Sequence, residues 1–474
     1  GNIWEFTIPS SAVKDLGVEY AVIAYNGIGL EKTTGIQGVS ITTNDENGLT
    51  LPTLSAGTSE SSYRIISVPL ALNSKTVTAV FGDDLGVVDK TKWRIFRYSS
   101  GRTNELSGSS SINPGEGYWL ISSVAAPLDS GPGTTVGRIS APVTINVTQG
   151  FNQIGNPYVF NVLWSDVTSY DDGTLTNAPL GLGNLKTYNG SFAETPILKK
   201  FEGGFVMAAS SGTLAFPAER NPAAGRTEIQ PVVPLHNSID GEDWEVAFEL
   251  TNGNQTMNFG GLGMNQKASD GYDEYDDFTL PRFIDYIELN HASKELFNLS
   301  YTKDIVPTWE NHTWEFSVAS NSNELLTMKW DNSFFGTNDK QLMLWDMSQQ
   351  RGLDMRKENQ VIFSASRSGH FKVFYGDESY VKEKTAIDQV VFHDLFPNPA
   401  TDMVTISFSV PGEDRVTIEV IDLLGRKIAT VADGNFKPGY HEMRWNTQEM
   451  TNGIYITQIK SQYSDQQKRL SINK

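Results

Sequence analysis

The stretch Leu395–Phe408, LFPNPATDMVTISF, places two prolines around an asparagine just before an apolar run with strand character. Proline disfavours helical backbone in the residue before it, so the chain should approach Met403 in extended geometry. The side chain of Asn398 can form the hydrogen bonds that hold a turn. The pattern therefore predicts a turn that feeds a β-strand from Met403 onward.

Three further segments follow this stretch in order: VTIEVIDLLGRKIAT, KPGYHEMRWNT and NGIYITQIKSQYSDQQKRLSINK. The first predicts an apolar hairpin whose strands are joined by a turn at Leu424 and Gly425. The last predicts a turn at Asn452 and Gly453 that feeds a strand with alternating isoleucines. Together with the opening stretch, they predict a small sandwich of about seven strands.

These four segments, taken in order, resemble the type A C-terminal sorting domain found in substrates of the type IX (Por) secretion system of Bacteroidota. The resemblance covers residues 395–474. It implies export through the periplasm and the type IX translocon, with recognition by an outer-membrane shuttle barrel. It also implies that a sortase removes the domain, so that the protein is anchored at the cell surface or released. The residues that match the family motifs, and are expected to carry sorting and shuttle binding, are Pro397, Asn398, Pro399, Asp422, Gly425, Arg426, Gly453, Tyr455 and Lys468.

The last strand-like segment is expected to contact the shuttle. A terminal strand can present its backbone and basic side chains to another protein at little folding cost. Residues 468–474 include Lys468, Arg469 and Lys474. From Phe396 onward, nine Lys plus Arg balance nine Asp plus Glu, so this region is neutral within an acidic chain. The alternative is that these residues only complete the sandwich.

Composition predicts an all-β protein of several domains. The 474 residues include 39% hydrophobic and 11% aromatic residues with 42 glycines, which favours strands joined by many turns. The net charge of −19 argues against nucleic-acid binding, because phosphate contacts need clustered Lys and Arg. The lack of cysteine excludes disulfides and thiolate zinc sites. No apolar run reaches the roughly 18 residues that a transmembrane helix needs.

Residues 46–228 are expected to form a duplicated β-module. The segment YRIISVPLAL from Tyr63 is echoed by FNQIGNPYVF from Phe151, and GEGYWLI around Gly117 is echoed by EGGFVMA around Gly204. Matches that keep their order at one offset, about 88 residues here, indicate a tandem repeat. Each copy is expected to supply one half of a paired β unit.

The other segments are expected to continue a tandem row of immunoglobulin-like sandwiches. Strand patterns in Ile3–Pro9 and Val18–Tyr25 predict the C-terminal part of an immunoglobulin- or fibronectin-like sandwich whose front is missing. A polar connector from Asp377 to Gln389 is expected to be an interdomain linker and the place where the sortase cuts. The expected units are 1–45 (partial sandwich), 46–228 (duplicated module), 229–376 (β-sandwich), 377–390 (linker) and 391–474 (sorting domain).

No catalytic site is predicted. The six histidines are scattered without an HExxH pattern, and no G-x-S-x-G elbow precedes a helix. The acidic segment ASDGYDEYDDF offers Asp270, Asp273 and Asp276 as calcium ligands, since calcium takes carboxylate and carbonyl oxygens. A solvated acidic loop is the alternative, because the spacing does not match an EF-hand. No other cofactor is expected.

The sequence therefore predicts an exported, non-catalytic surface or adhesive β-region carried by its sorting domain. The alternative is the C-terminal accessory region of a large secreted hydrolase, for example a peptidase, whose catalytic domain precedes residue 1. In either case the expected partners are the translocon, the shuttle barrel and the sortase.

Overall fold

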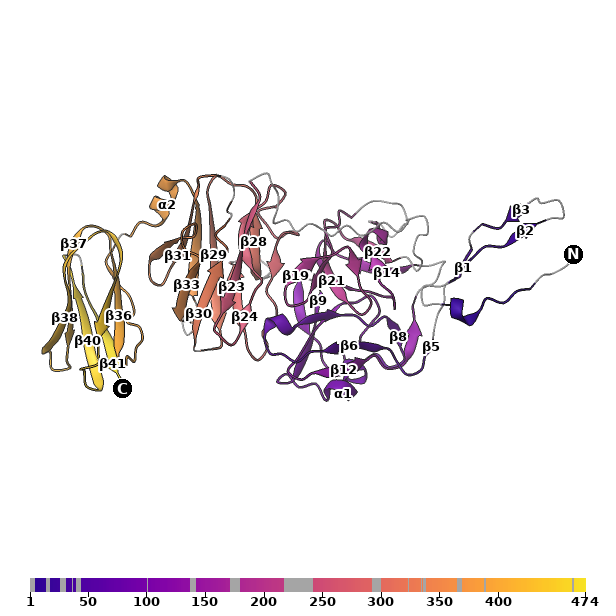
Figure 1. Ribbon diagram of the computed structural model, residues 1–474, viewed down its shortest axis with the longest axis horizontal. Helices are drawn as coiled ribbons and strands as arrows, with labels where there is room; N and C mark the ends of the chain where they lie inside the picture. Colours follow the sequence, from indigo (N-terminus) through magenta and orange to yellow (C-terminus); the bar gives the residue numbers. More distant parts are fainter. Residues whose placement is uncertain are drawn as a thin grey trace.

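The computed structural model is built almost entirely from strands. Only two α-helices occur among the described residues, α1 (Val77–Leu85) and α2 (Glu378–Lys384). Figure 1 shows an elongated row of units, with the C-terminal sandwich at one end and a thin N-terminal ribbon at the other. The all-β fold predicted from composition is confirmed. The structure describes residues 5–13, 18–25, 31–35, 37–39, 44–99, 101–136, 142–170, 180–216, 242–291, 300–322, 324–333, 335, 338–364, 369–387, 389–462 and 464–474.

The N-terminal unit is a ribbon of two nested hairpins in its described residues. The inner pair is β2 (Ile23–Tyr25) with β3 (Glu31–Thr33), and the outer pair is β1 (Val18–Tyr20) with β4 (Gln37–Val39). The strand expected over Ile3–Pro9 is absent from its described part, which leads instead into a short 3-10 turn. The strand expected over Val18–Tyr25 is interrupted between β1 and β2, where the Val22 amide donates to the Thr34 hydroxyl at 3.0 Å. Alternation alone therefore predicted longer strands than the ribbon contains.

The duplicated module repeats one four-stranded sheet. The first copy has the strand order β10–β9–β11–β7, with bounds Arg102–Glu105, Trp93–Ser99, Tyr118–Ser122 and Arg64–Ile66. The second copy has the equivalent order β19–β18–β21–β15, with bounds Phe192–Glu194, Lys186–Tyr188, Gly203–Ala208 and Gly150–Gly155. The two sheets thus have the same strand order, with equivalent strands about 90 residues apart in the sequence.

A second pairing is also repeated in each copy. An early strand pairs with a late one, as β6 (Thr50–Leu54) with β12 (Ala126–Asp129) and β14 (Val143–Val147) with β22 (Gly212–Phe216). The remaining strands of the module are β5 (Asn44–Asp45), β8 (Leu70–Leu72), β13 (Gly133–Thr135), β16 (Val162–Leu163), β17 (Thr168–Tyr170) and β20 (Ile197–Leu198). Among the described residues, the copies differ by α1, which the first copy inserts between β8 and β9.

Reciprocal backbone contacts join the two copies. The Ser67 amide of the first copy donates to the Phe201 carbonyl at 2.9 Å, and the matching Gly155 amide donates to the Gly115 carbonyl at 2.8 Å. A Cβ on Gly155 would lie 2.2 Å from the Glu116 carbonyl oxygen, so only glycine allows this approach. The glycine-rich segments of the repeat are therefore packing positions where two backbones meet.

The central sandwich spans residues 244–376 in one long path of strands. The path runs β32–β31–β34–β29–β27–β28–β25–β23–β30–β33, with β24 beside β23 and β26 beside β28. It folds back on itself around aromatic pairs such as Trp244 with Trp314, whose ring centroids are 5.8 Å apart. The bounds are β23 (Trp244–Thr251), β24 (Thr256–Met257), β25 (Gly261–Met264), β26 (Asp277–Phe278), β27 (Ile287–His291), β28 (Tyr301–Val306), β29 (His312–Ser320), β30 (Leu325–Trp330), β31 (Gln341–Asp346), β32 (Arg351–Asp354), β33 (Gln360–Ser364) and β34 (Gly369–Gly376).

The duplicated module and the central sandwich share one hydrophobic core. We call the region where the two units meet the seam. The ring of Phe278 lies 5.6 Å from that of Tyr98 and 4.6 Å from that of Phe205 (centroid distances), so a strand of the sandwich packs between both copies of the module. One continuous cluster of buried residues runs from Tyr63 to Tyr375. The boundary expected at residues 228 and 229 lies outside the described residues, but the two units on either side of it form one body.

The connector to the last unit is more structured than its polarity predicted. Helix α2 occupies Glu378–Lys384, and its N-cap Asp377 accepts a hydrogen bond from the Tyr380 amide at 2.8 Å. Val381 is buried, and the Tyr380 hydroxyl bonds the Thr313 hydroxyl at 2.8 Å, so the helix is docked on the central sandwich. A seven-residue helix with one buried side chain leaves almost no apolar period to detect, which is why the sequence indicated a plain linker.

The described residues of the C-terminal sandwich form seven strands, in agreement with the small sandwich of about seven strands that the sequence predicted. Three form one sheet in the order β35–β36–β39, and four form the other in the order β38–β37–β40–β41. Strand β36 begins at Met403, as the opening stretch predicted. The bounds are β35 (Val391–Phe392), β36 (Met403–Val410), β37 (Asp414–Ile421), β38 (Lys427–Phe436), β39 (Gly439–Asn446), β40 (Gly453–Lys460) and β41 (Asp465–Ile472).

Candidate functional site

The turns that carry the motifs gather at one end of the C-terminal sandwich. Ala400 forms a bridge with Ile472, and Gly453 also pairs with Ile472, so the turns before β36 and β40 lie beside the end of β41. Ile421 at the end of β37 pairs with Ile456 near the start of β40, which brings the β37–β38 turn to the same end. In Figure 1 this end carries the C-terminus.

The β37–β38 turn is held by the side chain of Asp422. Its carboxylate accepts the backbone amides of Leu424 and Arg426, both at 2.9 Å, and the Arg426 Nε at 2.7 Å. The hydrogen bond from the Arg426 amide is the main reason that the pKa of Asp422 is lowered. Gly425 has φ +80°, a conformation that glycine adopts without strain. Three of the motif residues, Asp422, Gly425 and Arg426, therefore act together to fix one turn.

The Pro397–Pro399 segment is tied to the last strand. The Asn398 side chain donates to the Arg469 carbonyl at 2.8 Å and accepts the Ser471 amide at 2.8 Å. Both proline peptide bonds in this segment are cis. The sequence predicted that Asn398 would hold its own turn, whereas it bonds β41, because the asparagine amide reaches backbone groups that an edge strand leaves open.

Strand β41 completes the sandwich. Leu470 and Ile472 are fully buried in its core, and the hydroxyl of buried Tyr455 donates to the Thr451 carbonyl at 3.0 Å. Lys468 forms an ion pair with Asp394, and the Lys474 ammonium donates to the Met450 carbonyl at 2.6 Å. Residues 468–474 are thus part of the folded domain, and shuttle binding by this strand stays a prediction.

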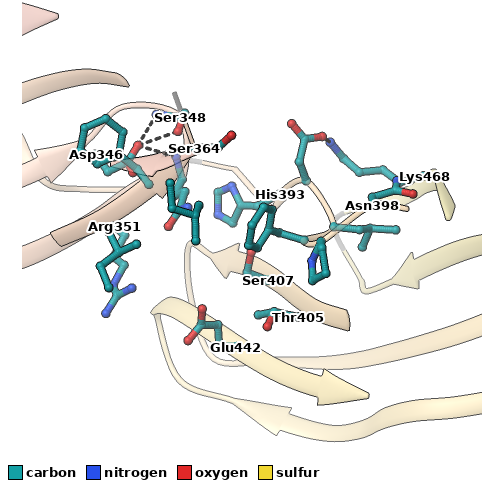
Figure 2. Close-up of a pocket in the computed structure, with 18 of the residues that line it drawn as sticks. Asp346, Ser348, Arg351, Ser364, His393, Asn398, Thr405, Ser407, Glu442 and Lys468 are labelled. Carbon is teal, nitrogen blue, oxygen red and sulfur yellow. Dashed lines mark hydrogen bonds and ion pairs between the residues drawn. The ribbon is translucent and has the colours of Figure 1, made fainter. Parts of the chain in front are cut away.

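A cleft of about 680 Å³ separates the C-terminal sandwich from the central sandwich (Figure 2). The Arg351 guanidinium of the central sandwich lies 5.2 Å from the ring centroid of Tyr440, a cation–π contact across the cleft. His393 is buried beside it and hydrogen-bonds the Ser409 hydroxyl at 2.7 Å. Burial lowers the pKa of His393 to about 4. Sequence reasoning missed these residues because no local pattern records which side chains meet across two units.

The cleft also contains motif residues. Pro397, Asn398, Pro399 and Lys468 line it, whereas the β37–β38 turn, Gly453 and Tyr455 do not. Across from them, the Asp346 carboxylate accepts the Ser348 amide at 2.8 Å and the Ser348 hydroxyl at 2.7 Å. The structure therefore divides the predicted sorting residues into a group that lines the cleft and a group that lies outside it.

The acidic segment before β26 lies at the seam. Asp276 is buried, and its carboxylate accepts the amides of Ile305 at 2.8 Å and Asp273 at 2.9 Å. Burial raises the pKa of Asp276 well above its usual value. The Asp273 carboxylate accepts the Tyr275 amide at 2.9 Å. The solvated loop expected as the alternative is wrong for this part of the segment, because the loop folds inward to bring Phe278 into the shared core.

The structure brings no three acidic or histidine side chains of the described residues together as a candidate metal-binding group. This includes Asp270, Asp273 and Asp276, the three residues proposed from the sequence. The adjacent Asp277 instead forms buried ion pairs with Lys186 of the module at 3.0 Å and with Lys303 at 3.1 Å. Burial would raise the pKa of Asp277, but Lys186 and Lys303 outweigh it and lower that pKa. The carboxylates thus have structural partners, and calcium binding stays a prediction.

Residues 394–473 match the family model described as the secretion system C-terminal sorting domain. This unit is a type IX sorting domain. The match confirms the resemblance, and a sorting domain of this kind implies interaction with the secretion system and export across the outer membrane, to the surface or the extracellular space.

Two other comparisons give no further information about the fold or the function of the chain. No curated protein matches the chain. A solved structure, described as the dimeric latent PorU from Porphyromonas gingivalis, is similar at 12% identity over 73% of this chain and 35% of that one, with a TM-score of 0.18. The chain thus spans about a third of that protein, and the likeness carries no argument about fold or function. No helix in the described part of the chain is long and apolar enough to cross a membrane.

Proposed function

We propose that the region before residue 377 is a non-catalytic passenger with a structural or adhesive role at the cell surface of a Gram-negative bacterium. The sorting domain directs it from the periplasm across the outer membrane. The partners in this route are the type IX translocon, an outer-membrane shuttle barrel, and a sortase that cuts in the connector.

The continuous core of the passenger is the observation that supports this role. Aromatic rings from the module and the sandwich interlock at the seam, and Asp277 joins both units through buried ion pairs. Such a seam makes the row of units one stiff body, because separating the units would expose apolar surface and leave charges unpaired. A stiff, acidic body is suited to hold an adhesive surface away from the cell.

The first experiment tests the route. The full chain and a variant that lacks residues 391–474 are expressed in a bacterium with a working type IX system, and surface exposure is measured by protease shaving of intact cells. The full chain is expected at the surface and the shortened variant in the periplasm. Equal surface exposure of both would overturn the proposed route.

The second experiment tests the role of the passenger. Cells that display the full chain are compared with cells that display the sorting domain on an unrelated passenger of similar size. Only the first cells are expected to show increased adhesion to glycan- or protein-coated surfaces. Equal adhesion, together with hydrolysis of a peptide or glycan by the displayed chain, would favour an accessory part of a hydrolase instead.

A further inference from the structure

The β37–β38 turn exposes two large apolar side chains that nothing in the described chain covers. Leu423 is 68% exposed and Leu424 is 80% exposed, and Ile428 at the start of β38 is 42% exposed. Exposed leucines scattered singly need no explanation, but neighbouring ones on a protruding turn form a patch. The sequence predicted a turn at Leu424 and Gly425, and the family resemblance assigned sorting roles only to Asp422, Gly425 and Arg426.

The turn is rigid in spite of its exposure. Asp422 accepts two backbone amides and the Arg426 side chain, and its own carbonyl accepts the Gly425 amide at 3.0 Å. These bonds fix the backbone that carries Leu423 and Leu424. A preorganised apolar tip binds a partner with little loss of conformational freedom, which is the usual property of an anchor residue.

The charged groups around the turn differ in exposure, and the cations are the more exposed partners of their ion pairs. Arg426 and Lys427 are 74% and 60% exposed, whereas their carboxylate partners Asp422 and Glu419 are only 15% and 22% exposed. A partner that approaches the turn therefore meets two leucines beside two exposed cations, whose paired carboxylates are less exposed. The complementary surface is an apolar pocket with an acidic rim.

The position of the turn keeps it away from the passenger. No residue of the turn lines the cleft, and β38 lies on the side of the sorting domain far from the central sandwich in Figure 1. The passenger can therefore dock at the cleft without covering the leucines. A partner protein could reach the turn while the whole chain stays folded.

We infer that Leu423 and Leu424 are the apolar anchors by which a protein of the export route recognises the sorting domain. In this assignment Asp422, Gly425 and Arg426 position the turn, and the leucines enter an acidic-rimmed apolar pocket of the partner. The inference rests on the proposed function, because it assumes that the sorting domain is read during export. A protein pocket is favoured over a lipid surface, since two leucines form a smaller anchor than one acyl chain, which alone gives marginal membrane binding.

The test compares full-length variants for surface exposure in a type IX-competent bacterium. The double variant Leu423→Ser with Leu424→Ser is expected to lose at least about tenfold in export, because each leucine is a buried contact in the complex. The conservative pair Leu423→Met with Leu424→Met is expected to stay within about twofold of the wild type. Val87→Ser is the matched control, because Val87 is an 84% exposed apolar residue of the passenger, and its export should not change.

The outcomes separate this inference from the proposed function. Normal export of the serine pair, with export blocked on removal of residues 391–474, overturns the anchor assignment and leaves the sorting role intact. Export of the variant that lacks residues 391–474 overturns the proposed function itself. A lowered unfolding transition of the purified serine pair also overturns the assignment, since it means that the leucines stabilise the fold.

A vesicle experiment covers the remaining alternative. The purified full chain and the serine pair are mixed with vesicles of phosphatidylethanolamine and phosphatidylglycerol and separated by flotation. Neither protein is expected to float with the vesicles. Flotation of the wild type alone would assign the leucines to a lipid surface and overturn the protein pocket.

Discussion

The two junctions of the central sandwich differ in kind. At the seam with the duplicated module, Phe278 packs among the rings of both copies, and Asp277 is paired inside the core. At the cleft with the sorting domain, Arg351 lies over Tyr440 and polar side chains line an open space. Separating the units at the seam would therefore cost much more free energy than separating them at the cleft. The difference indicates that the sorting domain, which the secretion system has to recognise, is attached to the central sandwich without a shared hydrophobic core.

The largest expected effect comes from removing residues 468–474. The deletion takes Leu470 and Ile472 out of the sorting-domain core, and each loss costs about 2–5 kcal/mol. The sorting domain should unfold while the passenger keeps its own thermal transition, as measured by calorimetry. Lys468→Ala is the control, since it keeps the strand. A passenger transition that falls with the deletion would show that the cleft couples the two units.

The next largest effect is expected at the seam. Phe278→Ala removes a ring that packs against both copies of the module, and we expect a loss of about 3–5 kcal/mol in the free energy of unfolding. Because the core is continuous, the module and the central sandwich should still unfold in one transition under denaturant. Trp309→Ala is the control, since Trp309 is half-exposed. Two separate passenger transitions in the wild type would contradict the shared core.

The pH response of the seam follows from Glu60, which lies buried near Glu288 and Arg282. Burial raises the pKa of Glu60 from 4.5 to about 8, so the folded protein holds this proton more tightly than the unfolded chain. The stabilisation is present below pH 4.5 and is lost as the pH rises through about 8, a fall of about 3–5 kcal/mol. Glu60→Gln should flatten this part of the stability profile of the passenger. An unchanged profile would mean that Glu60 does not titrate in the seam.

The cleft is expected to respond to pH in the opposite direction. Burial lowers the pKa of His393 from 6.5 to about 4, and Lys468 adds to the effect. The sorting domain should therefore lose about 1–3 kcal/mol of stability as the pH falls from 6.5 to 4, because the unfolded chain binds that proton first. His393→Gln should remove this loss, as measured by urea denaturation at several pH values. The same acid loss in that variant would assign it to another group.

The smallest effect is expected from Arg351→Ala. It removes the cation–π contact across the cleft, which contributes about 0.5–1 kcal/mol at an exposed site. Docking of the sorting domain should weaken, and a protease should cut the connector faster, near exposed Ala386 and Gln389 beyond the docked helix α2. Mass spectrometry of the fragments identifies the cut. Lys329→Ala, on the same sandwich and half-exposed, is the control and should leave the rate unchanged.

The sequence by itself determined the features that depend on local patterns and order. Alternation marked the strands of both sandwiches, and the spacing of the repeat segments predicted a duplication with which the repeated strand order agrees. Four consecutive motifs identified the sorting domain, which the family match confirms. Such signals survive in sequence because a strand, a turn or a motif is specified by residues that lie next to one another.

Only the tertiary structure decided which surfaces meet. It turned the acidic segment inward so that Asp277 pairs with Lys186 from a distant strand, and it joined Phe278 to the rings of Tyr98 and Phe205. It also left Leu423 and Leu424 exposed on a hydrogen-bonded turn, although two neighbouring apolar residues in a sequence are equally compatible with burial in a core. Burial depends on partners far away along the chain, so a local pattern shows that a side chain is apolar or charged but not what it will face.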